Sequence, residues 1–255
     1  MSGGFVSYGR DGEIGLLTIS NPPMNILTAE VRRDLARTLA TVGSESGLRA
    51  LILTGDGDRA FCAGADLREE GALTPETLRR FLVEDRQTYD TLEAVAVPVI
   101  AAVNGYCFGG GLELALACDI RLAVEGARFC APGAKIGLVA NTARLTRLLG
   151  EARAKELVLT SLVLSAAEAE RAGLVSEVVA AGQLMEAARR WADLIAANAP
   201  LAVAAAKRVI AGSGADFEQA LALELEAFAE MTATHDHRIA VEAFFAKHKP
   251  VFQGE

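Results

Sequence analysis

Two glycine-bearing loops constrain the fold of this chain more than any other feature of its sequence. Residues 61–67 read Phe-Cys-Ala-Gly-Ala-Asp-Leu, and residues 104–113 read Asn-Gly-Tyr-Cys-Phe-Gly-Gly-Gly-Leu-Glu. Each loop follows a short apolar run, residues 50–54 and residues 98–103, that is typical of a buried strand. Each then leads into an apolar helical pattern, so the chain repeats the order strand, loop, helix. This order indicates an α/β fold.

The same two loops offer a geometry for chemistry at a carbonyl group. A helix that begins at residues 109–111 leaves its first N–H groups without helical acceptors, and the helix dipole favours negative charge there. Glu113 follows Gly110 by three residues, so both lie on one helical face. We expect the N–H groups of Gly110 and Ala65 to bind a carbonyl oxygen on which negative charge develops. Glu113 would then move a proton at the neighbouring carbon.

Size and charge narrow the class of protein. A chain of 255 residues suits one medium-sized domain, with or without a helical appendage. A net charge of −8 at pH 7 argues against non-specific binding to nucleic acid. The N-terminal residues lack the basic and apolar segments of a signal peptide, and no apolar run is long enough to span a bilayer. The sequence therefore predicts a cytoplasmic protein with no nucleic-acid or membrane partner.

The four cysteines fit the same compartment. They are Cys62, Cys107, Cys118 and Cys130, and none forms a Cys-x-x-Cys pair. A zinc site needs ligands clustered at tighter spacing. We interpret all four as buried thiols in a reducing cytoplasm and expect no metal site.

Local signals predict the order of the elements. A hairpin is expected over residues 5–19, and Thr28 and Thr74 are expected to cap helices, the second beginning at Pro75. After about residue 140 the pattern is mostly helical. Helices are expected at residues 144–149, 152–160, 166–171, 183–197, 201–211 and 217–233, with one strand at 175–179. We divide the chain into a core, residues 1–195, and a C-terminal helical oligomerisation region, residues 196–255.

Taken together, the motifs resemble the crotonase superfamily, the enoyl-CoA hydratase/isomerase family. The resemblance covers essentially the whole chain. The matching segments are Asn-Pro-Pro-Met-Asn at 21–25, Leu-Ile-Leu-Thr-Gly-Asp-Gly at 51–57, the first loop at 60–67, the second loop with its flanks at 98–115, Ala-Cys-Asp-Ile-Arg at 117–121, and the stretches 166–175 and 243–252.

The resemblance implies a fold, an assembly and a ligand. A spiral of ββα units would form the core, and the C-terminal helices would join chains into a homotrimer or a dimer of trimers. The ligand would be an acyl-CoA thioester, so coenzyme A enters as part of the substrate and no prosthetic group is expected. The N–H groups of Ala65 and Gly110 would hold the thioester oxygen as an enolate forms, with Glu113 as acid and base.

The resemblance also implies which residues contact coenzyme A. The nucleotide would lie near Ala63, Asp66 and Leu67. The C-terminal helix of a neighbouring subunit would contribute an aromatic residue and a lysine, Phe244 and Lys247.

One position departs from the family pattern. Family hydratases usually carry a second glutamate within the stretch that reads here Phe-Cys-Ala-Pro-Gly-Ala-Lys-Ile-Gly at residues 129–137, and the matching residue is Gly133. The next loop, residues 138–143, is shorter than the Pro- and Gly-rich loop of the family. Hydration needs a base for water and an acid for the α-carbon, and two carboxylates divide that work naturally. Lys135 and Asn141 lie nearby, and we interpret both as surface or capping residues.

Three functions remain open. The first is a hydro-lyase that adds water to a 2-enoyl-CoA with Glu113 as acid and base. The second is another enolate reaction of an acyl-CoA, such as isomerisation, decarboxylation, C–C bond cleavage or thioester hydrolysis. The third, motivated by Gly133, is a non-catalytic acyl-CoA binder. A Ser-His-Asp hydrolase is disfavoured, because the three histidines lie near the C-terminus and no Gly-x-Ser-x-Gly occurs.

Overall fold

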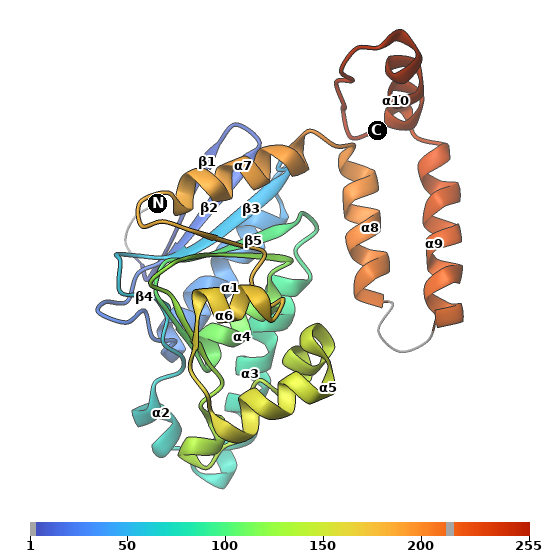
Figure 1. Cartoon of the computed structure of the whole chain (residues 1–255). Helices are drawn as coiled ribbons and strands as arrows, with labels where there is room; N and C mark the ends of the chain where they lie inside the picture. Colours follow the sequence, from blue (N-terminus) through green and yellow to red (C-terminus); the bar gives the residue numbers. More distant parts are fainter. Residues whose placement is uncertain (1–3, 213–216) are drawn as a thin grey trace.

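Two mixed sheets form the centre of the molecule (Figure 1). The structure is a computed structural model that describes residues 4–212 and 217–255. The larger sheet has the order β1 (Val6–Asp11), β2 (Ile14–Ile19), β3 (Ala50–Gly55), β5 (Val99–Val103), β7 (Ile120–Val124) and β10 (Glu177–Val179). The smaller has the order β4 (Ala60–Cys62), β6 (Tyr106–Phe108), β8 (Arg128–Cys130) and β9 (Leu164–Ser165). Neighbouring strands run parallel except in the pairs β1–β2 and β8–β9.

The chain repeats a ββα unit along these sheets. In β3–β4, β5–β6 and β7–β8 the first strand joins the larger sheet and the second joins the smaller. Helices follow each pair: α2 (Leu67–Gly71) and α3 (Pro75–Glu93), then α4 (Gly110–Ala117), then the 3₁₀ helix η1 (Gly133–Ile136) and α5 (Thr142–Thr160). The predicted spiral of ββα units is therefore confirmed.

Two helices begin at the capping residues predicted for them. The Thr28 side chain accepts a hydrogen bond from Val31 N at the start of α1 (Ala29–Gly43). Thr74 caps α3, which begins at Pro75. The two helices predicted at 144–149 and 152–160 are the two halves of α5, which breaks at Gly150 with φ of 76°. That left-handed conformation suits glycine, so one residue bends the helix.

Several short elements escaped prediction. No helix was predicted at residues 67–71, which form α2, and Asp66 caps this helix by accepting a hydrogen bond from Arg68 N. Strands β4, β6 and β9 have three residues or fewer. Segments of two or three residues carry almost no hydrophobic period, so these three strands were not predicted, although the equally short β10 lies within the strand predicted at 175–179.

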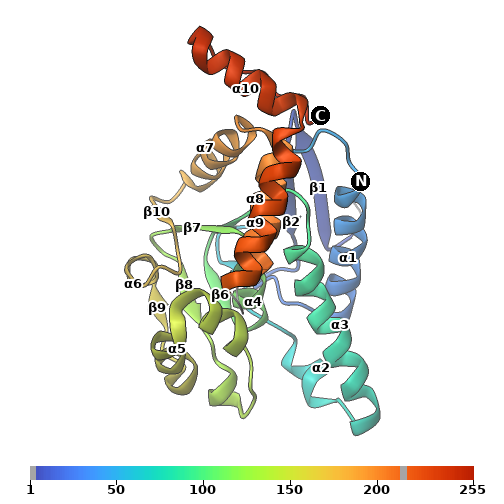
Figure 2. The same ribbon diagram turned by 90° about the vertical axis from the view of Figure 1, so that its right-hand side faces the viewer.

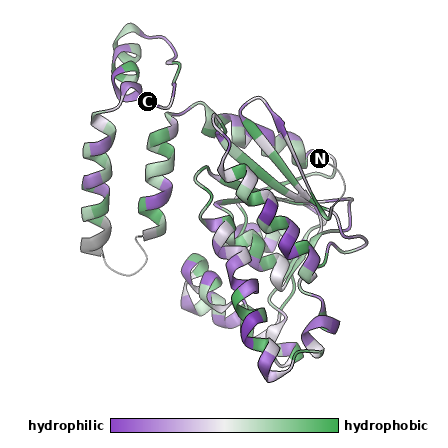
Figure 3. Cartoon of the chain, turned by 180° about the vertical axis from the view of Figure 1, so that it is seen from behind, coloured by the Kyte–Doolittle hydropathy of each residue, from purple (hydrophilic) through white to green (hydrophobic). Residues whose placement is uncertain are grey.

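Alternate residues of each central strand face two apolar layers. On β3, Leu51 and Leu53 join the main core between the sheets and helices α1, α3 and α4. Ala50 and Ile52 point to the other side, where α7 (Leu184–Ala196) covers the larger sheet (Figures 1 and 2). Burial of both faces explains why the central parallel strands read as continuous apolar runs. Figure 3 shows green, hydrophobic residues along these strands.

The C-terminal helices extend away from the core as an arm. The arm consists of α8 (Pro200–Gly212), α9 (Phe217–Thr232) and α10 (His235–Ala246), with α8 and α9 side by side (Figure 1). Lys207 Nζ ties it to the core by a 2.8 Å ion pair with Asp119. No single helix in the described ranges is long and apolar enough to span a membrane, although α7 and α8, bent by 104°, reach that length and composition as a pair. The boundary at residues 195 and 196 stays a prediction.

Candidate active site

The two glycine-bearing loops meet in the structure. A Cβ atom added to Gly64 would lie 3.3 Å from Gly110 N, and one added to Gly110 would lie 3.4 Å from Ala65 N. Gly64 has φ of 109°, a left-handed conformation that other residues rarely adopt. Its carbonyl oxygen accepts a 2.8 Å hydrogen bond from Leu27 N, which anchors the first loop. Glycine at both positions therefore permits close contact and leaves room beside two N–H groups.

Those two N–H groups are free to bind a ligand. Helix α4 begins at Gly110, and its first internal bond runs from Glu113 N to Gly109 O at 2.9 Å. The N–H of Gly110 thus lacks a helical acceptor. Within residues 4–212 and 217–255, neither this N–H nor that of Ala65 donates to the protein. Two unpaired donors beside a helix N-terminus suit an oxygen that carries negative charge.

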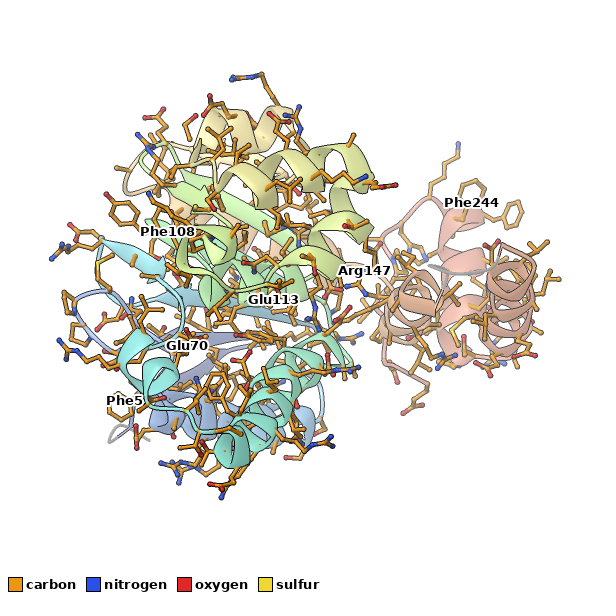
Figure 4. The ribbon with its side chains drawn as sticks, turned by 90° about the horizontal axis from the view of Figure 1, so that it is seen from below. Phe5, Glu70, Phe108, Glu113, Arg147 and Phe244 are labelled. Carbon is orange, nitrogen blue, oxygen red and sulfur yellow. The ribbon has the colours of Figure 1, made fainter. Side chains whose placement is uncertain are left out.

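Glu113 lies within the core (Figure 4), and its carboxylate is held at both oxygens. Asn141 Nδ2 donates to Glu113 Oε2 at 2.7 Å, and an Arg144 guanidinium nitrogen donates to Oε1 at 2.8 Å. Asn141 Nδ2 also donates to Gly109 O at 2.9 Å. Both acceptors lack a proton to give, so the amide orientation of Asn141 is determined by its partners. The carboxylate is therefore fixed relative to the loop that carries Gly110.

Arg144 belongs to a wider charge network. It bonds to Asp90 at 2.7 Å and to Glu93 at 3.0 Å, both on α3, and Glu93 also pairs with Arg147. Burial lowers the pKa of Arg144, but its hydrogen bonds to Glu113 and Glu93 outweigh that effect and raise the pKa above its usual value. Arg144 and Arg147 thus join α3, α4 and α5 through their ion pairs with Asp90, Glu93 and Glu113.

Gly133 has no space for a side chain. A Cβ atom there would lie 2.9 Å from Leu138 O and 3.2 Å from Ala140 N. The short loop that follows η1 folds back over Gly133 and fills the space that a glutamate would need. The backbone path of this loop therefore excludes a glutamate side chain at position 133.

The interpretation of Asn141 as a surface or capping residue was wrong. Asn141 is only 4 % exposed, its side chain makes no capping bond to α5, and it contacts Glu113 instead. Its left-handed backbone, with φ of 60°, turns the shortened loop so that the side chain points inward. Lys135 is exposed, as interpreted.

Sequence reasoning also missed Arg144. A basic residue in the first turn of a helix opposes the helix dipole. Arg144 is the third residue of α5, and that position signals an acidic partner elsewhere. The identity of the partner could not be read from the chain, because Glu113 lies 31 residues away.

The residues expected near the CoA nucleotide lie next to Ala65. Asp66 caps α2, and the Leu67 side chain is 58 % exposed. Ala63 N donates to Met24 O at 3.0 Å, which fixes the start of the loop. These residues form an accessible rim beside the two N–H groups, and their role in binding stays a prediction.

Phe244 and Lys247 are not brought to this site within one chain. Phe244 lies on α10 and is 77 % exposed, and Lys247 is the exposed residue that ends this helix. Figure 4 shows Phe244 on the arm and Glu113 within the core. Any contact between them requires another copy of the chain.

The four cysteines are free and buried, as predicted. Cys62 Sγ accepts a 3.5 Å hydrogen bond from Gly64 N, and Cys107 Sγ donates to Gly111 O at 3.4 Å. Burial raises the pKa of the Cys62 thiol to about 12. In the described part of the chain, no group of three or more His, Cys, Asp or Glu side chains has a metal-binding arrangement.

Known proteins share this sequence along nearly its full length. The family model for enoyl-CoA hydratase/isomerase matches residues 9–255. A short-chain enoyl-CoA hydratase of Clostridium acetobutylicum is 38 % identical over 245 residues, 94 % of each chain. A crotonyl-CoA hydratase of Syntrophomonas wolfei is 35 % identical over 248 residues, 95 % of each chain. This chain belongs to the enoyl-CoA hydratase/isomerase family.

Solved structures of family members have the same fold. An enoyl-CoA hydratase from Bacillus anthracis superposes with a TM-score of 0.94 at 36 % identity, and the match covers 98 % of this chain and 100 % of the other. The α/β crotonase fold expected from the sequence is therefore confirmed. The enoyl-CoA hydratase/isomerase family acts on acyl-CoA thioesters, generally without a prosthetic group.

Proposed function

We propose that this protein is an enoyl-CoA hydratase that adds water to a 2-enoyl-CoA through a thioester enolate. One observation carries the proposal: two unpaired N–H groups, of Ala65 and Gly110, lie close together at the start of the helix that carries the doubly anchored carboxylate of Glu113. Similarity to relatives named as hydratases supports the same reaction.

In this mechanism the two N–H groups bind the thioester oxygen. Glu113 accepts a proton from water, and the water oxygen bonds to the β-carbon while the electrons of the double bond move toward the thioester oxygen. The resulting enolate is stabilised by Ala65 N, Gly110 N and the positive end of α4. Protonation of the α-carbon completes the addition.

The first experiment follows the loss of enoyl-thioester absorbance when purified protein meets crotonyl-CoA. We expect turnover in the parent protein and a decrease of about 10²–10⁴-fold in Glu113→Gln, the usual contribution of a general acid–base group. Acyl-CoA binding should persist in the variant. An unchanged rate in Glu113→Gln would exclude Glu113 from the reaction.

The closed space at Gly133 favours a second candidate function, another enolate reaction or acyl-CoA binding without turnover. A panel of malonyl-type and β-keto acyl-CoA thioesters distinguishes these from hydration. Turnover of one of these with none of crotonyl-CoA would support a different enolate reaction. Tight binding with no turnover across the panel would support a binder.

We propose further that the functional unit is a homotrimer or a dimer of trimers, in which Phe244 and Lys247 contact CoA bound to a neighbouring core. The arm exposes large apolar side chains that a lone chain would leave in water. They include Ile210, Leu225, Phe228, Phe244 and Phe245. Light scattering on the purified protein should give a mass of three or six times 26.8 kDa, and a monomeric mass would contradict the assembly.

We also propose that CoA binds along Ala63, Asp66 and Leu67 and that the protein works in the cytoplasm. The exposed position of Leu67 beside Ala65 supports the first point. Four unpaired thiols support the second, because a reducing compartment keeps cysteines free. Leu67→Glu should weaken CoA binding in calorimetry, whereas Leu159→Glu, on exposed α5 surface, should leave it unchanged.

A further inference from the structure

A tyrosine–aspartate pair on α3 lies beside the site and has no role in the mechanism above. Asp85 and Tyr89 are four residues apart, so they lie one turn apart on the same face of the helix. Tyr89 Oη donates a 3.0 Å hydrogen bond to Asp85 Oδ1. The Tyr89 side chain is 4 % exposed, which makes this a buried hydroxyl paired with a carboxylate.

The Tyr89 hydroxyl lies next to the unpaired N–H groups. A Cβ atom added to Gly110 would lie 2.9 Å from Tyr89 Oη and 3.4 Å from Ala65 N. The guanidinium carbon of Arg144, which holds Glu113, lies 5.8 Å from the centre of the Tyr89 ring. The phenol is therefore placed between the proposed oxyanion hole and the residue that orients Glu113.

Charged groups from three other helices surround the pair. Asp85 faces Tyr89 on α3, Arg32 on α1, Glu70 on α2 and Glu113 on α4. Burial raises the pKa of Asp85, and the charge of Glu113 adds to the effect, while the Tyr89 hydrogen bond and Arg32 oppose it. Burial also raises the pKa of Tyr89 well above its usual value. Tyr89 thus keeps its proton at neutral pH, and Asp85 holds its proton to a higher pH than an exposed aspartate does.

We propose that Tyr89, backed by Asp85, is the second proton-transfer group of this site and replaces the carboxylate that Gly133 cannot carry. The proposal deepens the proposed function, since it assigns the acid that the enolate needs. Tyr89 Oη lies beside the groups that bind the thioester oxygen, and the α-carbon is two bonds from that oxygen. Asp85 acts through Tyr89 as a positioning and proton-storing residue.

The proton balance of this step closes without another reactant. When Asp85 is protonated, the 3.0 Å hydrogen bond reverses: the Asp85 carboxylic acid donates to Tyr89 Oη, and the phenolic proton of Tyr89 is free for the substrate. The enolate α-carbon takes that phenolic proton, and the phenolate takes the proton of the Asp85 carboxylic acid. Glu113, which received a proton from water, releases it to solvent, and Asp85 regains one from solvent. The net change is the addition of one water molecule across the double bond.

The test measures exchange of the α-hydrogens of butyryl-CoA in D₂O by mass spectrometry, beside hydration of crotonyl-CoA. Exchange needs the enolate and the proton-transfer group but no water addition. We expect Tyr89→Phe, which keeps the ring, to lower both rates by about 10²-fold or more while acyl-CoA binding persists. The control is Tyr8→Phe on the distant strand β1. It removes another tyrosine–carboxylate hydrogen bond, from Tyr8 Oη to Glu45 at 2.8 Å, and should change neither rate.

Asp85→Asn supplies a second, independent readout. Protonation of the enolate needs the acid form of Asp85, whereas removal of an α-proton needs the ionised form. Hydration should therefore fall, and exchange should rise, as pH increases through the raised pKa of Asp85. Asp85→Asn should be slow in both reactions and should lose both pH limbs, that is, the fall of hydration and the rise of exchange with pH. Glu84→Gln, on the exposed face of α3, should retain both pH limbs.

The outcomes separate this proposal from the proposed function. Exchange that depends on Tyr89 without hydration would overturn the hydratase function and support the role of Tyr89. If the parent protein hydrates crotonyl-CoA and Tyr89→Phe exchanges the α-hydrogens of butyryl-CoA at the parent rate, the hydratase function is supported and the role of Tyr89 is overturned. If Tyr89→Phe fails to fold in a thermal melt, persistence of both pH limbs in Asp85→Asn overturns the role of the pair. Neither reaction in the parent protein would overturn both.

Discussion

The two sides of the candidate site follow the family pattern to different degrees. On one side, the loops that carry Ala65 and Gly110 match the family motifs and offer only backbone N–H groups. On the other side, residues 129–144 depart from the pattern: Gly133 has no side-chain space, and Asn141 and Arg144 contact Glu113 instead. Backbone N–H donors depend on one conformation of the loop, and that conformation restricts which residues the loop can contain. Side-chain groups can be supplied from any element that reaches the same point, here α3 and α5.

On the side that offers the backbone N–H groups, Gly110→Ala should have the largest effect on activity. The added Cβ would lie 2.9 Å from Tyr89 Oη and 3.2 Å from Leu27 Cδ1, so it would displace the loop or the substrate. We expect kcat/KM for crotonyl-CoA to fall about 10²–10³-fold, the usual effect of losing one oxyanion donor. Gly126→Ala, where the added atom meets nothing within 4 Å, is the matched control and should leave the rate unchanged.

The second side should respond to Arg144→Gln. This change leaves Glu113, Asp90 and Glu93 without their shared cation and frees the Glu113 carboxylate to rotate. We expect a decrease in kcat of about 10–10²-fold from lost positioning. Stability in urea should fall by about 1–3 kcal/mol. Arg153→Gln, an exposed pair partner of Glu156 on the same helix, should affect neither; an equal loss there would show that only helix stability was measured.

Gly133→Glu tests why the second side lacks a carboxylate at position 133: because of the residue alone, or because the loop backbone closes the space for a side chain. Because Leu138 O and Ala140 N close the space, the new carboxylate should not reach the site. We expect no gain in hydration and a loss of stability of about 1–3 kcal/mol from overpacking. Ala134→Glu adds the same single negative charge at an exposed neighbouring position and should stay within about 0.5 kcal/mol of the parent. A faster enzyme in Gly133→Glu would refute the closed-space argument.

The smallest effect concerns stability and pH at Asp85. Its pKa is raised in the folded chain, so the folded state binds this proton more tightly than the unfolded state does. Stability from this group therefore falls as pH rises from the ordinary aspartate pKa through the raised one. Asp85→Asn removes that loss, so the variant should melt at a higher temperature than the parent at neutral pH, with the difference closing in acid. A difference that is constant with pH would contradict the assignment.

Local signals made much of the fold predictable. Thr28 and Thr74 cap the helices that follow them, and residues 50–54 and 99–103 read as buried strands because both of their faces are covered. The two donor loops were also readable, since each motif is contiguous. Their contact in space follows from the repeated ββα unit, which returns each loop to the same end of the sheets.

Contacts between distant elements were not predictable in this way. Asn141 and Arg144 reach Glu113 across 28 and 31 residues, and Asp85 and Tyr89 reach the loops from a different helix. Such contacts depend on how elements pack, which neither spacing nor composition encodes. Asn141 was misread for this reason, because a polar residue before a helix usually serves as a cap.

Two of the buried thiols can report on the movement of the two donor loops. Cys62 and Cys107 lie directly beneath the backbone of the two loops, through their bonds with Gly64 and Gly111. A thiol reagent attacks the exposed thiolate, so neither cysteine reacts until the loops part. All four cysteines of the chain are buried, and no surface thiol obscures the signal. The rate of labelling at Cys62 and Cys107, resolved from Cys118 and Cys130 by mass spectrometry, therefore reports how often the donor loops separate, in the absence of any substrate or turnover.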